Sequence, residues 1–156
     1  MVVILQNIRS THNVGSIFRT ADAAGCRKIF LCGITPGPKD RFGKINLKFS
    51  KVSLGAENYV SWKRVGSTTR LLDKFKKAGY KIIALEQNKK AVSLFSEKSG
   101  SARTSKRAIV LGAEIKGLSD AVLKRADKII AIPMRGKKES LNVAVAFGIA
   151  IFHLSR

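Results

Sequence analysis

The stretch AIVLGAEIKGLSDAVLKRADKIIAIP (108–133) alternates between apolar and polar segments. Its two ends, 108–113 and 128–133, are short apolar runs rich in Ile and Val, which is typical of strands covered on both faces of a parallel sheet. Residues 119–126 between them have the pattern of a short helix. Because parallel strands are joined by a crossover that is usually helical, this stretch predicts a βαβ unit.

The same alternation continues along the rest of the chain. Strands are predicted at 2–8, 28–34 and 81–86, and helices at 13–25, 67–78 and 141–154. The last helix, 141–154, is apolar nearly all round, so it is either fully buried or packed against another subunit. The turn-rich stretch 35–58 and the polar stretch 96–107 are predicted as surface loops. We therefore expect a single α/β domain over 1–156, with a parallel sheet flanked by helices.

The chain is strongly basic, with 30 Lys and Arg against 10 Asp and Glu and a formal net charge of +20. Residues 39–107 contain eighteen of these cations and five of the acids, so this part alone carries +13. A basic field concentrated in one region is the footprint of a protein that binds the nucleic-acid backbone. A generic basic surface, as on many ribosome-associated proteins, is the alternative.

The two cysteines, Cys26 and Cys32, lie in or beside apolar stretches and have neither C-x-x-C spacing nor that of a zinc site. We expect buried thiols, no metal site, and a reducing, cytoplasmic compartment. The N-terminus lacks the basic region and cleavage site of a signal peptide. No apolar run approaches the ~20 residues of a membrane span, so no membrane association is expected.

Polar segments follow three of the predicted strands, at the edge where open α/β sheets bind ligands. The first, 7–22, has Asn13 at a predicted helix N-cap and Gly15, Arg19 and Asp22 on one helix face. A simple Asn cap with a surface Arg19–Asp22 pair is the alternative interpretation.

The second segment, 109–119, has G-x-x-x-x-G spacing after a strand. Leu118 stands where a P-loop needs its phosphate-binding lysine, so a P-loop is excluded. Glu114 is an acid in an otherwise basic protein, which a plain glycine-rich turn leaves unexplained. In the third segment, 132–148, Ser140 and Asn142 precede the apolar helix as candidate N-caps.

Together the three segments resemble the three motifs of the SpoU/TrmH-type RNA 2′-O-ribose methyltransferases of the SPOUT class. The first has N-x-G-x-x-x-R-T-A (13–21), the second G-x-E-x-x-G-L-S (112–119), and the third I-P-M-x-G-x-x-x-S-L-N-V (132–143). The stretch SLGAENYVSW (53–62) also looks like the family's L-G-A-E-x-x-V-x-W. So many fixed offsets in the right order, over almost the whole chain, make a chance match improbable.

The resemblance implies a parallel sheet with a deep trefoil knot near the C-terminus, whose loops hold S-adenosylmethionine. It also implies a homodimer with the active site near the interface, acting on tRNA or rRNA. The cofactor-binding residues it implies are Leu111, Gly112, Gly117, Ile132, Met134, Ser140 and Leu141. The separate RNA-binding domain of many relatives is absent from 1–156. RNA capture is therefore expected to rest on 39–107 and on the partner subunit.

The resemblance assigns the leading catalytic part to Arg19, with Asn13, Glu114, Ser140 and Asn142 around it. The ribose 2′-hydroxyl must lose its proton as it attacks the methyl group, and Arg19 has been viewed in this family as the base. A guanidinium pKa above about 12 favours another role, in which Arg19 orients the hydroxyl and stabilises the developing alkoxide. A non-catalytic RNA-binding or ribosome-assembly protein is the alternative function, but such a protein has no reason to keep this whole constellation.

A few residues depart from the family pattern or have two interpretations. Ile115, Lys116 and Lys138 differ from the family's usual residues at loop edges, which affects substrate preference more than chemistry. We expect His12 on the surface, with RNA contact as the alternative. His153, at a helix end, is expected to be structural. Trp62 is expected to pack in the core, with stacking on a base as the alternative.

Overall fold

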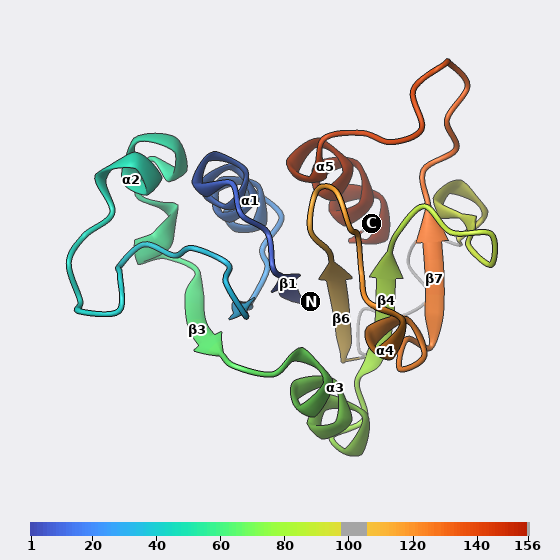
Figure 1. Ribbon diagram of the computed structural model, residues 1–156, viewed down its shortest axis with the longest axis horizontal. Coiled ribbons are helices and arrows are strands. Elements are labelled where there is room, and N and C mark those ends of the chain that lie inside the picture. Colours follow the sequence, from blue (N-terminus) through green and yellow to red (C-terminus); the bar gives the residue numbers. More distant parts are fainter. Residues whose placement is uncertain (98–105, 156) are drawn as a thin grey trace.

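A computed structural model describes residues 1–97 and 106–155. It contains a seven-stranded sheet with the strand order β3-β2-β1-β6-β4-β7-β5, and every paired register within it is parallel (Figure 1). The strands are β1 Val2–Gln6, β2 Lys28–Cys32, β3 Ser61–Val65, β4 Lys81–Leu85, β5 Val92–Ser93, β6 Arg107–Leu111 and β7 Lys128–Ala131. The predicted parallel sheet is confirmed.

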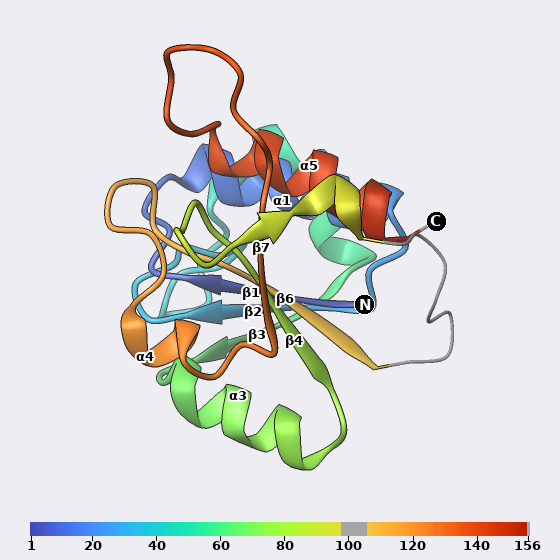
Figure 2. The same cartoon turned by 90° about the vertical axis from the view of Figure 1, so that its right-hand side faces the viewer.

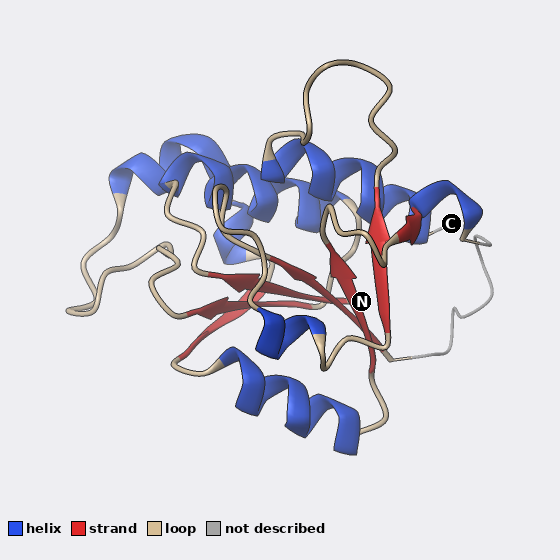
Figure 3. Ribbon diagram, turned by 45° about the vertical axis from the view of Figure 1, so that its right-hand side comes forward, coloured by secondary structure: helices blue, strands red, loops and turns tan. Residues whose placement is uncertain are grey.

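Helices cover both faces of the sheet (Figures 2 and 3). One face is covered by α1, α2 and α5, and the opposite face by α3 and α4. The helices are α1 Thr11–Ala23, α2 Leu47–Ser53, α3 Thr68–Lys77, α4 Asp120–Leu123 and α5 Val143–Leu154, with 3₁₀ turns η1 Ala56–Asn58 and η2 Leu94–Ser96. No helix in this described part is long and apolar enough to cross a membrane.

The central strands are buried on both sides, as their continuous apolar runs predict. In β1, Val3 and Leu5 belong to the core under α1 and α5, whereas Val2 and Ile4 belong to the core under α3 and α4. This alternation follows from the two-residue period of a strand. The ends of the predicted strands differ from the observed ones by one or two residues, which is the usual uncertainty of boundaries.

The edge strand β3 is absent from the predictions. Its sequence SWKRV is polar, and Ser61, Lys63 and Arg64 are exposed. An edge strand has one paired side and few buried side chains, so no apolar run marks it. Trp62 packs against the hydrophobic core as predicted.

The stretch 35–58 is not purely loop, because it contains α2. Asn46 caps this helix by accepting a hydrogen bond from Phe49 N–H at 3.2 Å, and the buried Phe49 ring packs edge-on against Phe18 of α1, 5.0 Å between centroids. Gly15 allows the close approach, since an added Cβ would lie 3.0 Å from Val52 Cβ. Gly15 is therefore buried against α2, so placing it with Arg19 and Asp22 on a face opposite the apolar stripe is wrong for Gly15, whereas Arg19 is exposed.

The C-terminal helix α5 packs beside α1 on the sheet (Figure 2). Phe147, Ala150 and Ile151 are buried, whereas Val145, Ile149 and Phe152 are 37–52% exposed. The exposed residues recur every three or four positions, so they form one apolar stripe along the helix. The trefoil knot is consistent with this fold and stays a prediction. Most of the predicted polar loop 96–107, residues 98–105, lies outside the described residues, and β6 begins at Arg107.

Candidate functional site

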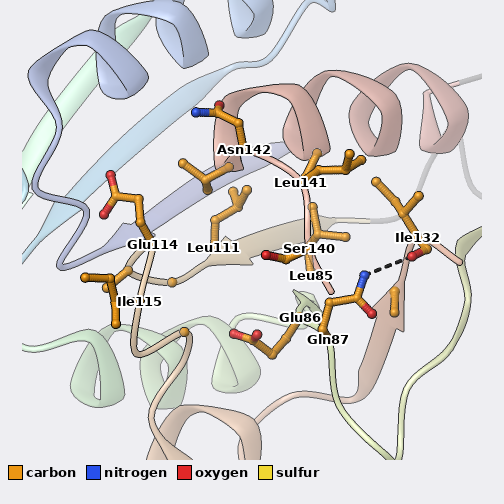
Figure 4. A pocket seen from close by; sticks show the side chains of 16 residues that line it. Leu85, Glu86, Gln87, Leu111, Glu114, Ile115, Ile132, Ser140, Leu141 and Asn142 are labelled. Carbon is orange, nitrogen blue, oxygen red and sulfur yellow. Dashed lines mark hydrogen bonds between the residues drawn. The ribbon is translucent and has the colours of Figure 1, made fainter. Parts of the chain in front are cut away.

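A cavity of about 370 Å³ opens where β4, β6 and β7 end (Figure 4). Six of the seven predicted cofactor residues line it, namely Leu111, Gly112, Gly117, Ile132, Ser140 and Leu141. Met134 does not line this cavity. The apolar walls come from strand ends and from the start of α5. The cavity volume falls within the range of small-molecule sites, about 300–1,000 Å³.

The loop after β6 folds back on itself beside this cavity. Ala113 O accepts a hydrogen bond from Gly117 N–H at 2.9 Å, and Gly117 has a φ of 62°, a left-handed conformation that favours glycine. A Cβ on Gly112 would lie 2.3 Å from the carbonyl carbon of Gly117. The glycine pair of the second motif thus has a steric cause, the close contact of two backbone segments.

Two polar residues of the cavity, Glu86 and Gln87, were not among the predicted site residues. Glu86 Oε2 accepts a hydrogen bond from Leu118 N–H at 2.6 Å and so holds the end of the loop. Gln87 Nε2 donates to Ile132 O at 2.8 Å and joins β4 to the segment after β7 (Figure 4). Glu86 ends the predicted strand 81–86 and Gln87 follows it, so the rule that ligands bind at carboxyl strand ends would have found them.

The three sequence segments meet in a chain of side-chain hydrogen bonds. Asn142 Nδ2 donates to Asn13 Oδ1 at 3.0 Å, and Asn13 Nδ2 donates to Glu114 Oε1 at 3.1 Å. Glu114 also accepts hydrogen bonds from Arg9 N–H and Ser10 N–H, both at 3.3 Å. This chain joins the start of α1, the loop after β6 and the start of α5, and each of its two side-chain links spans more than 100 residues.

Asn13 is not the helix cap that its position suggests. The N-cap of α1 is Ser10, whose hydroxyl accepts a hydrogen bond from Asn13 N–H at 3.1 Å. Asn13 lies in the first turn, and its buried side chain serves the hydrogen-bond chain instead. The helix begins two residues earlier than predicted for this reason.

The carboxylate of Glu114 is stabilised in its charged form. Partial burial by itself would raise its pKa, but hydrogen bonds from its own amide, from Asn13 and from the amides of Arg9 and Ser10 together lower the pKa below its ordinary value. A carboxylate at the N-terminus of α1 also interacts favourably with the helix dipole. Glu114 therefore holds the loop to the helix as an anion.

Of the two candidate caps for α5, Asn142 has this role and Ser140 does not. Asn142 Oδ1 accepts hydrogen bonds from Ala144 N–H at 2.9 Å and Val145 N–H at 3.4 Å. Ser140 is exposed and lines the cavity (Figure 4). Both residues line the cavity, and Asn142 in addition caps the helix.

Arg19 lies apart from this cavity. It is exposed on α1, six residues after Asn13, or about 9 Å along the helix at 1.5 Å per residue. Its neighbour Thr20 approaches α5, since a Cβ on Gly148 would lie 3.8 Å from the Thr20 methyl. Arg19 itself is not among the residues that line the cavity.

A second cavity, of about 890 Å³, shares residues of the 113–117 loop with the first. Arg9 and Lys116 contribute cations to its lining, whereas Ile34 and Ile115 contribute side chains that are 61% and 97% exposed. The lining also includes Gln6, Asn7, Ser10, Asn13, Ala113, Glu114, Gly117 and Ser119. Of the departures from the family pattern, Lys116 thus lines this second cavity and Ile115 lines both.

The remaining predicted residues are accounted for individually. Cys26 and Cys32 are buried free thiols, and burial raises the pKa of Cys26 to about 11. His153 is structural, since its ring Nε2 is hydrogen-bonded to Glu97 O at 3.2 Å. His12 is exposed. Within residues 1–97 and 106–155, no three His, Cys, Asp or Glu side chains cluster as metal ligands.

Among characterised proteins, the chain is similar to two 23S rRNA (guanosine-2'-O-)-methyltransferases called RlmB. The protein of Coxiella burnetii is 34% identical over 156 residues, which are 100% of this chain and 58% of that protein. The protein of Escherichia coli K12 is 32% identical over 155 residues, 99% of this chain and 59% of that protein. The chain therefore spans less than two thirds of the length of these relatives.

Solved structures and a family profile give the same result. The A. aeolicus TrmH/SpoU tRNA modifying enzyme has a TM-score of 0.82 at 30% identity, over 99% of this chain and 73% of that chain. The AdoMet-bound rRNA methyltransferase from Sinorhizobium meliloti has a TM-score of 0.85 at 27% identity, over 98% and 54%. The profile of the SpoU rRNA Methylase family matches residues 1–152. Because this profile matches nearly the whole of the chain, the chain belongs to the SpoU rRNA methylase family.

Proposed function

We propose that this protein transfers the methyl group of S-adenosylmethionine to a ribose 2′-hydroxyl of ribosomal or transfer RNA. The observation that carries the proposal is the Asn142–Asn13–Glu114 chain, which joins three distant segments beside a cavity of cofactor size. A protein that only binds RNA needs no such cavity. The names of its relatives, which describe methyltransferases of 23S rRNA, support the same activity.

The first cavity has a lining that suits S-adenosylmethionine. Leu111, Ile132 and Leu141 offer apolar surface to the adenine ring, and the folded loop at 113–117 offers backbone groups to its polar edge. When bound, the cofactor supplies an electrophilic methyl group on its sulfonium. We assign Ser140 and Gln87 to polar contacts in this cavity, and Glu86 to holding the loop.

We assign Arg19 to orienting the 2′-hydroxyl and stabilising the alkoxide that develops on it. Because Arg19 lies apart from the first cavity of its own chain, we propose that it acts at the cavity of a second subunit. The exposed apolar stripe of α5, Val145, Ile149 and Phe152, supports a homodimer that pairs this face. Asn13, Glu114 and Asn142 then have a positioning role, since they join α1 to the cofactor loop.

We propose that RNA reaches the second cavity, which shares the 113–117 loop with the first. Arg9 and Lys116 suit phosphate groups, and the net charge of +20 suits a polyanion. The free buried thiols and the RNA substrate are consistent with a cytoplasmic protein.

Methyl transfer from radiolabelled S-adenosylmethionine to total RNA tests the proposal. The RNA should come from a strain that lacks this protein, and label should appear at a single position resistant to alkaline cleavage, the mark of a 2′-O-methyl group. Arg19→Ala should lose about 100- to 1,000-fold in rate, the scale of one electrostatic group, and keep cofactor affinity. A wild-type protein that binds the RNA without labelling it would refute the proposed activity.

Mixing subunits tests whether Arg19 acts across the interface. Arg19→Ala and Gly112→Ala subunits are both expected to be inactive by themselves. Mixed dimers would contain one intact pair of Arg19 and cofactor cavity, so roughly a quarter of the wild-type activity should return in a two-fold symmetric dimer. No recovery in mixtures that demonstrably exchange subunits would assign Arg19 to the cavity of its own chain.

A further inference from the structure

We propose that the segment 38–46, called here the tip hairpin, is an RNA contact in which Phe42 stacks on an unpaired base. This inference rests on the proposed function, because it names how the same protein holds its RNA. The tip hairpin follows β2 and leads into α2, and it forms the cyan loop at the left of Figure 1. Because β2 and β6 are parallel strands of one sheet, this loop leaves the same edge as the 112–119 loop.

Phe42 is exposed to a degree that a packing role does not explain. Its side chain is 81% exposed, and the guanidinium of Arg41 lies over its ring, 4.7 Å from the centroid. With one face covered by Arg41 and the ring largely in solvent, the other face is open to a flat ligand. Aromatic rings beside cations are the platform on which proteins stack unpaired bases.

The tip hairpin is held in shape by hydrogen bonds within it. Asp40 Oδ1 accepts hydrogen bonds from Phe42 N–H at 2.8 Å and Lys44 N–H at 2.9 Å. Lys44 O accepts from Asp40 N–H at 2.9 Å, and Gly43 has a φ of 83°, which a left-handed turn requires. The carboxylate of Asp40 thus accepts hydrogen bonds within the turn, and this turn leaves Arg41 and Phe42 on its outer side.

The base of the tip hairpin is fixed to the sheet. Arg64 of β3 donates from Nη2 to Lys39 O at 2.7 Å and from Nη1 to Thr35 O at 3.1 Å. Asn46 donates from Nδ2 to Gly37 O at 3.3 Å while it caps α2. A platform fixed in this way loses little conformational entropy when it binds a ligand.

Charge identifies RNA as the partner rather than a protein surface. Residues 39–51 contain five Lys and Arg and a single acid, Asp40, a net charge of +4 in thirteen residues. Apolar side chains interleave with these cations, since Ile45 is 60% and Leu47 71% exposed. Proteins that recognise single-stranded RNA place cations, which bind phosphates, beside apolar and aromatic side chains, which contact bases.

The full chain and a stem–loop RNA with an unpaired loop test the inference, with a duplex of equal length for comparison. Phe42→Ala should weaken stem–loop binding about 5- to 100-fold, the loss expected for one stacked base, and change duplex binding little. Tyr59→Ala is the matched control, because Tyr59 is 80% exposed outside the hairpin, and it should bind as the wild type does. Phe42→Trp should keep affinity and show fluorescence quenching by the stem–loop.

Asp40 variants separate shape from charge. Asp40→Ala should weaken stem–loop binding, although it removes a negative charge, because it releases the turn. Asp40→Asn should restore binding, since its side-chain oxygen still accepts from the same amides. Stronger binding by both variants would show that only charge matters and would overturn the role of the turn.

Other outcomes would overturn the proposal as a whole. Equal binding by Phe42→Ala and Tyr59→Ala, or equal losses for stem–loop and duplex, would exclude stacking. A change of sedimentation in Phe42→Ala without a change in RNA affinity would make the tip hairpin a contact between copies of the chain. The proposed activity fails separately: a wild-type protein that binds the stem–loop through Phe42 yet methylates no RNA would refute the activity alone.

Discussion

Replacing Glu114 tests whether the loop of the first cavity is held in place by a charged hydrogen-bond acceptor. In Glu114→Gln one carboxylate oxygen becomes an amide donor, so one of the N–H groups of Arg9, Ser10 and Asn13 loses its acceptor and faces another donor. The three hydrogen bonds measure 3.1–3.3 Å. Those from Arg9 and Ser10 are exposed and the one from Asn13 is only partly buried, so each is weaker than a fully buried charged pair.

The expected loss of stability follows from these contacts. A net value of about 0.5 kcal/mol for each of the three hydrogen bonds, with the penalty of the opposed donors, gives a loss of ~1–2 kcal/mol in the free energy of unfolding at pH 7. For a domain of this size the melting temperature should fall by about 2–8 °C. Affinity for S-adenosylmethionine should fall as well, because the loop is part of the cavity wall.

The pH dependence identifies the charge as the cause. The hydrogen bonds lower the pKa of folded Glu114 below its ordinary value of 4.5, so the unfolded chain takes up the proton first as the pH falls. The stabilisation is therefore fully present above pH 4.5 and is lost as the pH falls through the lower, folded pKa. The difference in unfolding free energy between wild type and Glu114→Gln should be constant at neutral pH and should shrink below pH 4.5.

Urea unfolding at a series of pH values measures this difference, with Glu139→Gln as control. Glu139 is an exposed carboxylate of the 133–142 loop, and its replacement should leave stability within about 0.5 kcal/mol. A Glu114→Gln protein as stable as the wild type at pH 7, or one whose deficit persists unchanged in acid, would contradict the assigned role.

Three further predictions concern the loops and α5. Gly112→Ala should abolish cofactor binding or folding, because its Cβ would lie 2.3 Å from a backbone atom of Gly117. Gly136→Ala should be neutral, since no atom lies within 4 Å of a Cβ at that position. Thermal melting and cofactor titration compare the two variants. Asn142→Ala should lose about 1 kcal/mol of stability, because it removes the cap of α5. Ser140→Ala should keep stability but weaken cofactor binding. Urea unfolding measures the stability of each variant, and titration calorimetry measures its cofactor affinity. Val145→Glu should give an inactive monomer by light scattering; an active dimer would rule out the α5 interface.

Local sequence determined most of the sheet. The runs that become β1, β4 and β6 are buried on both faces, and only continuous apolar stretches satisfy that condition, so their location was predictable. The motif glycines were predictable too, and the structure adds the cause for Gly112 and Gly117, which is contact between backbone segments. Family membership depended on motif spacing, which needs no coordinates.

Sequence patterns do not predict elements whose stability comes from partners far away in the chain. The helix α2 depends on Phe49 meeting Phe18, and β3 depends on pairing with β2 rather than on its own polar sequence. Asn13 looked like a cap because local spacing allows that role. Its actual partners, Glu114 and Asn142, are 101 and 129 residues away.

The amino-acid sequence thus fixes where the buried strands and the three motifs lie, because burial and motif spacing are local properties. Their arrangement follows from the tertiary structure: the order that places β6 between β1 and β4, the cavity shared by Gln87 and Ser140, and the separation of Arg19 from that cavity. These relations depend on how strands far apart in sequence become neighbours. Side-chain periodicity carries no information on that order, because a strand buried on both faces has the same pattern beside any neighbour.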